Sequence, residues 1–280
     1  MKAYVSVDFE GLPHIVSFSQ LLPKGKMFYE ARSIVTRIVK HICEVLNREG
    51  VKEIVIADSH GCMINIDPEE LPENVKLIRG IPRPVSMMIG VEECDLAMFI
   101  GYHAGAGTVR GVLDHTLSST SIYRLKINNI VASEYLLNAL VAGYYEVPLI
   151  LVAGDEALRD EVQKYTPWAE FVPLKRGLSR FSAASYSTAR LLRDLECSIM
   201  RALDKYEKGK TDIFKIDGNI VLEVSFRTTE FADVAENLPG AERVDGYTVR
   251  YICNNIVEAY KVLELVTLAC LGVRYLVTEC

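Results

Sequence analysis

The chain has 280 residues, of which 50% are hydrophobic and 24% are charged, and its formal net charge at pH 7 is −6. This apolar content is ample for a large core in one large domain or two smaller ones. The acidic balance argues against a nucleic-acid-binding surface. A short basic cluster, Lys175, Arg176 and Arg180, is interpreted as a solvated face.

The sequence shows neither a signal-peptide pattern at its N-terminus nor an apolar stretch of about eighteen residues. A membrane partner is therefore not expected. The seven cysteines are odd in number and show no Cys-x-x-Cys spacing. This pattern favours reduced thiols in a cytoplasmic protein over disulfide bonds or a cysteine-bound zinc.

The chain begins with an apolar run over residues 2–7, which predicts a strand buried on both faces. The run ends abruptly at Asp8 and Glu10. Because an unpaired charge is costly in the core, both acids belong at the strand end. Residues 28–47 then carry apolar side chains on one stripe, which predicts a helix that leads to the next strand.

Two further apolar runs, residues 53–57 and 96–100, predict strands that also end in polar residues. His60 follows the first run in Asp-Ser-His, and His103 follows the second in Gly-Tyr-His. In an open α/β sheet the loops at the carboxyl ends of parallel strands converge on one crevice. We therefore expect both histidines to lie near the two acids of the first strand.

A third histidine, His115, lies in the glycine-containing loop after the third strand. The pair Asn128-Asn129 then predicts a hairpin turn. Glu134 opens an apolar helix for which Ser133 is a suitable N-cap, and the helix dipole favours its ionised form. An ionised carboxylate is what a divalent cation needs.

Residues 1–155, which end with a predicted strand at 149–153, are expected to form a metal-binding, doubly wound α/β domain with a mostly parallel sheet. Residues 156–280 do not repeat helices and strands in the parallel pattern, so they are expected to form a smaller α+β domain. Its predicted elements are helices near 188–206, 229–237 and 255–271 and strands at 219–226 and 247–253.

These positions make five residues candidate metal ligands: Asp8, Glu10, His60, His103 and Glu134. A mixture of imidazoles and carboxylates suits zinc better than calcium or magnesium. Each residue also has a simpler interpretation, as a turn cap, a hydrogen-bonded loop histidine or an acid that matches its helix dipole. Their convergence favours the metal site. Asp58 and Asn65 are candidates to orient His60, whereas His14 and His41 look structural.

Several segments occur in the order of a known family: S-V-D-F-E-G at 6–11, D-S-H at 58–60, G-Y-H-A at 101–104, G-V-x-x-H ending at His115, N-A-x-V-A-G-Y-Y-x-V-P at 138–148, V-A-G-D at 152–155, E-V-S-F at 223–226 and N-L-P-G at 237–240. They resemble the D-aminopeptidase family of dipeptide-transport operons, the M55 metallopeptidases. The similarity runs along nearly the whole chain.

The resemblance implies two zinc ions per chain, held by the five candidate ligands with Asp8 as the bridge between metals. It also implies that His115 is catalytic. One departure is that the loop from His103 to His115 is one residue longer and richer in glycine than the family pattern. This difference bears on substrate specificity and on the placement of His115 rather than on the metal ligands.

The sequence therefore predicts a zinc-dependent aminopeptidase that cleaves short peptides with a hydroxide activated by two metals. The preference for an N-terminal D-amino acid and a ring-shaped homo-oligomer, a decamer, is implied by the resemblance alone. His115 is expected to act as a general base or acid or to bind the developing oxyanion, with pairing to Asp114 as the alternative. A di-metal amidase or phosphoesterase, and a metal-stabilised assembly protein without turnover, remain alternative functions.

Overall fold

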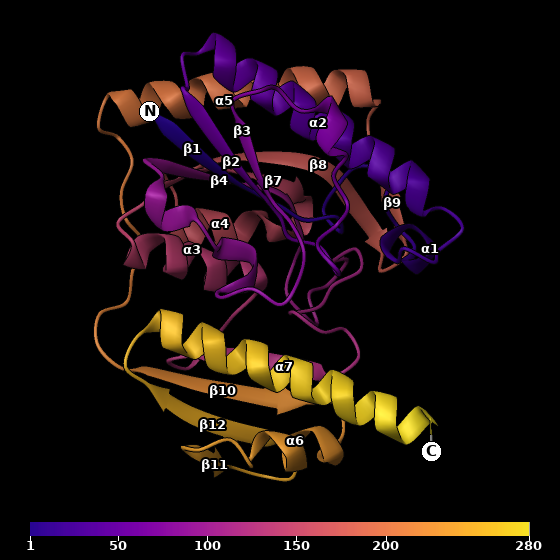
Figure 1. Ribbon diagram of the computed structural model, residues 1–280. Coiled ribbons are helices and arrows are strands. Elements are labelled where there is room, and N and C mark those ends of the chain that lie inside the picture. The colour runs from indigo at the N-terminus through magenta and orange to yellow at the C-terminus, as the bar shows by residue number, and fades with distance from the viewer. Residues whose placement is uncertain (280) are drawn as a thin grey trace.

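Seven strands form one mostly parallel sheet, the first sheet, in the order β3-β2-β1-β4-β7-β8-β9. The structure, a computed structural model, describes residues 1–279 (Figure 1). Neighbouring strands of the first sheet run parallel except β9, which pairs antiparallel with β8. The strands are β1 (Lys2–Val7), β2 (Glu53–Asp58), β3 (Val75–Ile78), β4 (Leu96–Tyr102), β7 (Leu149–Asp155), β8 (Glu170–Ser179) and β9 (Ser182–Ala184).

The central strands of the first sheet are apolar because helices cover both of its faces. Every residue of β4 and β7 is buried. The helices α2 (Phe28–Arg48) and α5 (Thr188–Glu207) lie on one face, and α3 (Glu134–Tyr144) and α4 (Arg159–Tyr165) lie on the other (Figure 1). The predicted doubly wound α/β fold is therefore confirmed.

A second sheet is antiparallel and has the order β11-β12-β10-β5-β6. Asn128 and Asn129 connect β5 to β6 with φ angles of 48° and 66°, so the predicted hairpin turn is confirmed. The elements of this layer are β5 (Ile122–Ile127), β6 (Ile130–Val131), β10 (Ile220–Phe226), β11 (Ala241–Arg243), β12 (Thr248–Cys253), α6 (Thr229–Ala235) and α7 (Ile256–Glu279).

Helix α7 lies between the second sheet and the rest of the molecule, where it packs against α3 (Figure 1). One continuous cluster of buried side chains includes Phe99 of the first sheet, Val224 of the second and Leu263 of α7. The two sheets therefore share a core.

The chain passes between the two sheets more than once. Strands β5 and β6 precede β7 but pair in the second sheet, whereas β8, β9 and α5 follow residue 155 but belong with the first sheet. The domain division at residue 155 stays a prediction, and the strand pairings cross that position.

The predicted elements start and end within a few residues of their observed positions, except that α7 continues to Glu279 beyond the predicted end at residue 271. Strands β3, β8, β9 and β11 and helix α4 were not predicted, and β8 matters most for the site. Its sequence contains Pro173 and Gly177, which weaken a strand pattern. The interpretation of the neighbouring basic cluster as a solvated face was wrong for Lys175, which is buried, because β8 carries this residue into the interior.

The remaining elements are short. They are α1 (Phe18–Leu21) and single 3-10 turns at Pro68–Glu70, Ser86–Met88, Val91–Glu93 and Glu156–Leu158. Within residues 1–279, no helix combines the length and the apolar character that crossing a bilayer requires.

Candidate metal centre

The candidate ligands meet at the carboxyl edge of the first sheet. Asp8 and Glu10 follow β1, His60 follows β2, His103 follows β4, and Glu134 is the first residue of α3. Ser133 caps α3 by accepting a hydrogen bond from the amide of Leu136, which fixes the helix start. His115 lies in the loop after β4 and joins the same cluster.

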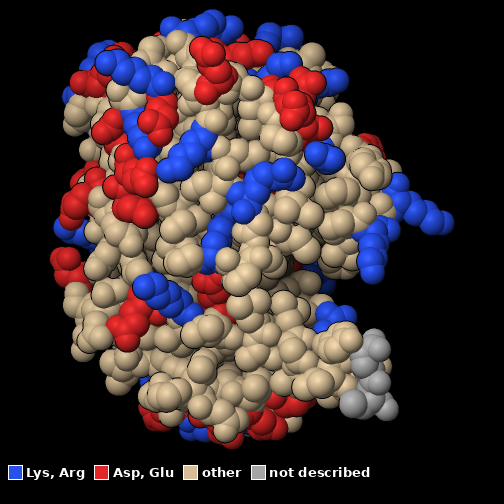
Figure 2. All heavy atoms as spheres, viewed as in Figure 1, with Lys and Arg blue, Asp and Glu red and all other residues tan. Residues whose placement is uncertain are grey.

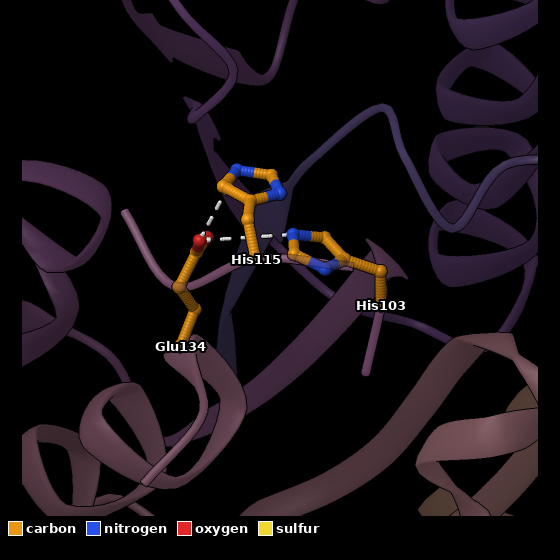
Figure 3. Close-up of side chains that lie close together, drawn as sticks. All are labelled: His103, His115 and Glu134. Carbon is orange, nitrogen blue, oxygen red and sulfur yellow. Dashed lines mark ion pairs between the residues drawn. The ribbon is translucent and has the colours of Figure 1, made fainter. Parts of the chain in front are cut away.

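Each imidazole approaches at least one carboxylate. His60 Nδ1 lies 2.9 Å from Glu10 Oε2 and 3.3 Å from Asp8 Oδ1. His103 Nε2 lies 3.5 Å from Asp8 Oδ2 and 3.7 Å from Glu134 Oε1. His115 Nε2 lies 3.5 Å from the same Glu134 oxygen, so Glu134 faces two histidines (Figure 3).

The other nitrogen of each imidazole is engaged by the main chain. His60 Nε2 donates to the carbonyl of Leu21 at 3.1 Å, His103 Nδ1 to that of Ala104 at 3.0 Å, and His115 Nδ1 to that of Leu113 at 2.9 Å. These bonds fix the orientation of each ring and direct its second nitrogen toward the carboxylates. Metal-binding histidines are held in this way.

The carboxylates are crowded and removed from solvent. Asp8 and Glu10 are each 3% exposed, and Glu134 is 5% exposed. Burial and the neighbouring charge of Glu10 raise the pKa of Asp8 well above its usual range. Burial also acts to raise the pKa of Glu10, but the imidazoles of His60, His115 and His103 outweigh it and lower that pKa.

The pKa values of the histidines diverge. Burial acts to lower the pKa of His60, but the charges of Glu10 and Asp8 raise it well above its usual range. Burial and the neighbouring His115 lower the pKa of His103. The rings of His103 and His115 are stacked with centroids 4.4 Å apart. The cluster thus combines carboxylates with an imidazole, that of His103, that favours the neutral, metal-binding form.

Three buried polar atoms of the cluster make no hydrogen bond within the described part of the chain: Asp8 Oδ2, Glu10 Oε2 and His103 Nε2. Buried polar atoms are rarely left without a partner, and neighbouring carboxylates repel one another. A bound cation would satisfy these atoms and offset the repulsion. The residues present therefore fit a divalent metal ion.

The ligand atoms form two overlapping groups, and within each group they lie within 4.8 Å of one another. One group contains Asp8, Glu10 and His103, and the other contains His103, His115 and Glu134. Two groups of donors side by side can accommodate two metal ions. His115, which the sequence placed outside the ligand set, lies about as close to the acids as His103 does.

The prediction that Asp58 orients the ring of His60 was wrong. The Asp58 carboxylate accepts hydrogen bonds from the main chain of Asn65 and Ile66 and from the Asn65 side chain. Asn65 in turn holds the main-chain carbonyl of His60 rather than its ring. Asp58 therefore shapes the loop, and a carbonyl of α1 orients the ring.

The two remaining histidines lie outside the cluster. His14 is exposed, and His41 Nε2 contacts the main-chain oxygen of Leu192 and lies 3.4 Å from Glu196.

A cavity of about 430 Å³ adjoins the cluster. Its lining includes Asp8, Glu10, His60, His115 and Glu134 of the cluster, and α7 supplies another part of the wall. The same side of the molecule is hollowed between α1 and the C-terminal half of α7 (Figure 2). The sequence did not indicate that α7 borders the site, because this contact depends on how the second sheet packs. Its cavity-lining residues are Tyr260, Glu264, Thr267, Leu268 and Leu271.

The family model Peptidase_M55, described as D-aminopeptidase, matches residues 1–265. A protein of Bacillus subtilis (strain 168) named D-aminopeptidase is 33% identical over 271 residues, which are 95% of this chain and 97% of that protein.

A solved structure shares the fold. It is described as the Zn-dependent D-aminopeptidase DppA from Bacillus subtilis, a self-compartmentalizing protease. The two chains superpose with a TM-score of 0.92 at 30% sequence identity, over 97% of this chain and 98% of the other.

Proposed function

Because this chain belongs to the D-aminopeptidase family Peptidase_M55, we infer that it is a zinc-dependent aminopeptidase. We propose further that it uses two zinc ions per chain and releases an N-terminal D-amino acid from short peptides. The observation that carries the two-metal proposal is the pair of overlapping donor groups, in which three buried atoms make no hydrogen bond within the described residues.

We assign the metal ligands as Asp8, Glu10, His60, His103 and Glu134. Asp8 suits a bridging role because one of its oxygens faces His60 and the other faces His103. When bound, zinc supplies a Lewis acid that polarises the scissile carbonyl and makes a bound water more acidic.

We propose that His115 accepts or donates a proton during catalysis. Its Nδ1 donates a hydrogen bond to the carbonyl of Leu113. Nε2 is therefore the atom that can accept or donate a proton at the cavity. Its side chain is 14% exposed and lines the cavity, whereas the side chain of His103 is almost completely buried. This access to the cavity supports a role as general base or acid.

The cavity also bears on the substrate. A volume of about 430 Å³ suits a small molecule such as a di- or tripeptide. Among the described residues that line it there is no Arg or Lys. A phosphate-binding site would favour such cations, so this lining disfavours the phosphoesterase alternative.

We propose that copies of the chain assemble into a ring-shaped homo-oligomer, a decamer. The similarity to a structure described as self-compartmentalizing supports an assembly of this kind. A closed assembly would restrict access to peptides small enough to enter it.

The six cysteines that the structure describes carry free thiols, which supports the proposed cytoplasmic location.

Metal analysis combined with three peptides tests the proposed function. Purified protein is expected to contain about two zinc ions per chain and to cleave D-Ala-D-Ala faster than L-Ala-L-Ala. N-acetyl-D-Ala-D-Ala is expected to be inert, because an aminopeptidase requires a free amine. Equal rates on both stereoisomers would reduce the function to a general aminopeptidase. Preference for the blocked peptide would indicate an amidase.

Four histidine variants test the residue assignments. His60→Ala and His103→Ala are expected to lower the zinc content. His115→Ala is expected to keep its zinc and its fold while turnover falls by a factor on the order of 10²–10⁴. His41→Ala, at a histidine of α2 outside the site, is the control. Loss of zinc from His115→Ala would show that this residue is a ligand.

A further inference from the structure

Lys175 is a buried cation whose role the proposed function leaves unexplained. It lies on β8 and is only 3% exposed, yet it forms no ion pair with any residue that the structure describes. Its ammonium group donates instead to two main-chain carbonyls, those of Glu10 and Ile15, the latter at 2.5 Å. Burying an amine is costly unless its donors are satisfied, so these two contacts determine its position.

The two carbonyls belong to the segment that carries Asp8 and Glu10. This segment, residues 8–17, leaves β1 and extends toward β8, which lies beyond β4 and β7 in the first sheet. The amide of Gly11 donates to the carbonyl of Gly101 at 2.7 Å, and an added Cβ at Gly11 would overlap the Tyr102 carbonyl. The segment is therefore held on β4 in its middle and by Lys175 at its far side.

Asp155 holds the other loop of the site. It is the neighbour of Lys175 in the pairing of β7 with β8, and it is fully buried. Its Oδ2 accepts a hydrogen bond of 2.7 Å from the amide of Val112, three residues before His115. Two adjacent, oppositely charged residues thus contact the metal-ligand segment and the His115 loop from one place in the sheet.

We propose that Lys175 and Asp155 are positioning residues of the active site. Lys175 fixes the segment of Asp8 and Glu10, and its loss weakens metal binding. Asp155 fixes the loop of His115, and its loss slows turnover without loss of metal. The inference rests on the proposed function, because it assigns these contacts a task only if Glu10 binds metal and His115 moves protons.

Two single variants separate the two tasks. Lys175→Met keeps the unbranched length of the side chain and removes its donors, so zinc affinity, measured by competition with a chelator, is expected to fall about 10- to 100-fold. Amide hydrogen exchange of residues 9–16 is expected to accelerate in the same variant. Asp155→Ala is expected to keep its zinc affinity and to lower kcat at least tenfold, with a smaller change in KM.

The matched control is Lys210→Met, which removes an exposed lysine. It is expected to change neither zinc affinity nor the hydrogen exchange of residues 9–16. Wild-type zinc affinity and exchange rates in Lys175→Met would overturn the proposal. Loss of zinc from Asp155→Ala would overturn the division of tasks. A wild-type protein that binds no zinc would instead contradict the proposed function.

The double variant Lys175→Met/Asp155→Ala distinguishes positioning from charge compensation. It removes both buried charges together, so neither is left without its oppositely charged neighbour. It therefore still tests the proposal if Lys175→Met alone fails to fold. Because the donors to Glu10 and Ile15 are still missing, its zinc affinity is expected to stay as low as in Lys175→Met. Recovery of wild-type affinity would show that Lys175 only compensates Asp155, and the proposal would fail.

Discussion

Individual carboxylates of this protein lie in different electrostatic environments. Asp8 and Glu10 lie among imidazoles, whereas Glu161 of α4 is largely buried and accepts a hydrogen bond of 2.9 Å from the Ser133 hydroxyl. Burial raises the pKa of Glu161 to about 7, although the bond from Ser133 opposes the shift. An ionised Glu161 therefore destabilises the folded state at neutral pH.

Replacing Glu161 with Gln is expected to stabilise the zinc-free protein increasingly as pH rises. The folded-state pKa of about 7 is above the unfolded value of 4.5, so the folded state binds this proton more tightly. Its stabilising effect is present below pH 4.5 and is lost as pH rises toward 7. Relative to wild type, Glu161→Gln should gain about 3 kcal/mol in unfolding free energy at pH 8 and about 1 kcal/mol at pH 5.

Denaturant unfolding at both pH values measures this difference. Glu69→Gln, at an exposed acid, is the control and should show no comparable pH dependence. An equal change in unfolding free energy for Glu161→Gln at pH 5 and pH 8 would contradict the raised pKa of Glu161.

The sequence predicted the acids and histidines of the cluster because each follows a strand, or opens a helix, that has a clear apolar sequence pattern. It did not predict what holds them. Leu21 orients His60 through a main-chain carbonyl, which any residue type provides. Lys175 looked like a surface residue because neighbouring basic residues usually are, and only the course of β8 buries it.

At the scale of elements, β8 and the turn that follows it support the His115 loop. The amide of Leu113 donates to the carbonyl of Arg180 at 2.8 Å, and Arg180 Nε lies 3.0 Å from Asp114 Oδ1. Gly177 lets β8 approach the main chain of Arg110 so closely that a Cβ there would overlap the Arg110 carbonyl. This strand therefore sets the position of the loop on which His115 lies.

Gly177→Ala is expected to displace the loop and lower kcat about tenfold or more, because small misplacements of catalytic groups are costly. Zinc content should stay at the wild-type level, since an added Cβ at Gly177 would meet Arg110 and Val112 of the His115 loop first. Steady-state kinetics with metal analysis checks both. The control is Gly246→Ala, where an added Cβ meets only Thr229 Cγ2 at 4.0 Å. Unchanged kcat in Gly177→Ala would show that the loop adapts.

At the scale of the whole molecule, α7 carries a long exposed apolar surface. Its C-terminal half extends beyond the second sheet, and this part of the surface is mostly free of charged residues in the view of Figure 2. Large exposed apolar patches commonly mark interaction sites. The exposed residues are Leu265, Leu268, Leu271, Tyr275, Leu276 and Val277.

If copies assemble as proposed, this surface of α7 is expected to be buried between them. The double variant Leu265→Arg/Leu276→Arg, which avoids the cavity-lining residues, should yield a smaller particle than wild type in size-exclusion chromatography with light scattering. Met200→Arg, at an exposed apolar residue of α5, should leave the mass unchanged. A wild-type mass in the double variant would place the interface elsewhere.

The interleaving of the two sheets has a consequence for how the protein is made. Glu134 directly follows the β5–β6 hairpin, whose turn is held on β10 by hydrogen bonds of 2.9 and 2.7 Å between Asn128 and Val221. All six residues of the cluster leave the ribosome well before β10, α6, β12 and α7 do. The growing chain therefore contains every proposed ligand long before it contains the strands of the second sheet that hold the hairpin before Glu134. We expect the complete site to form only near the end of synthesis.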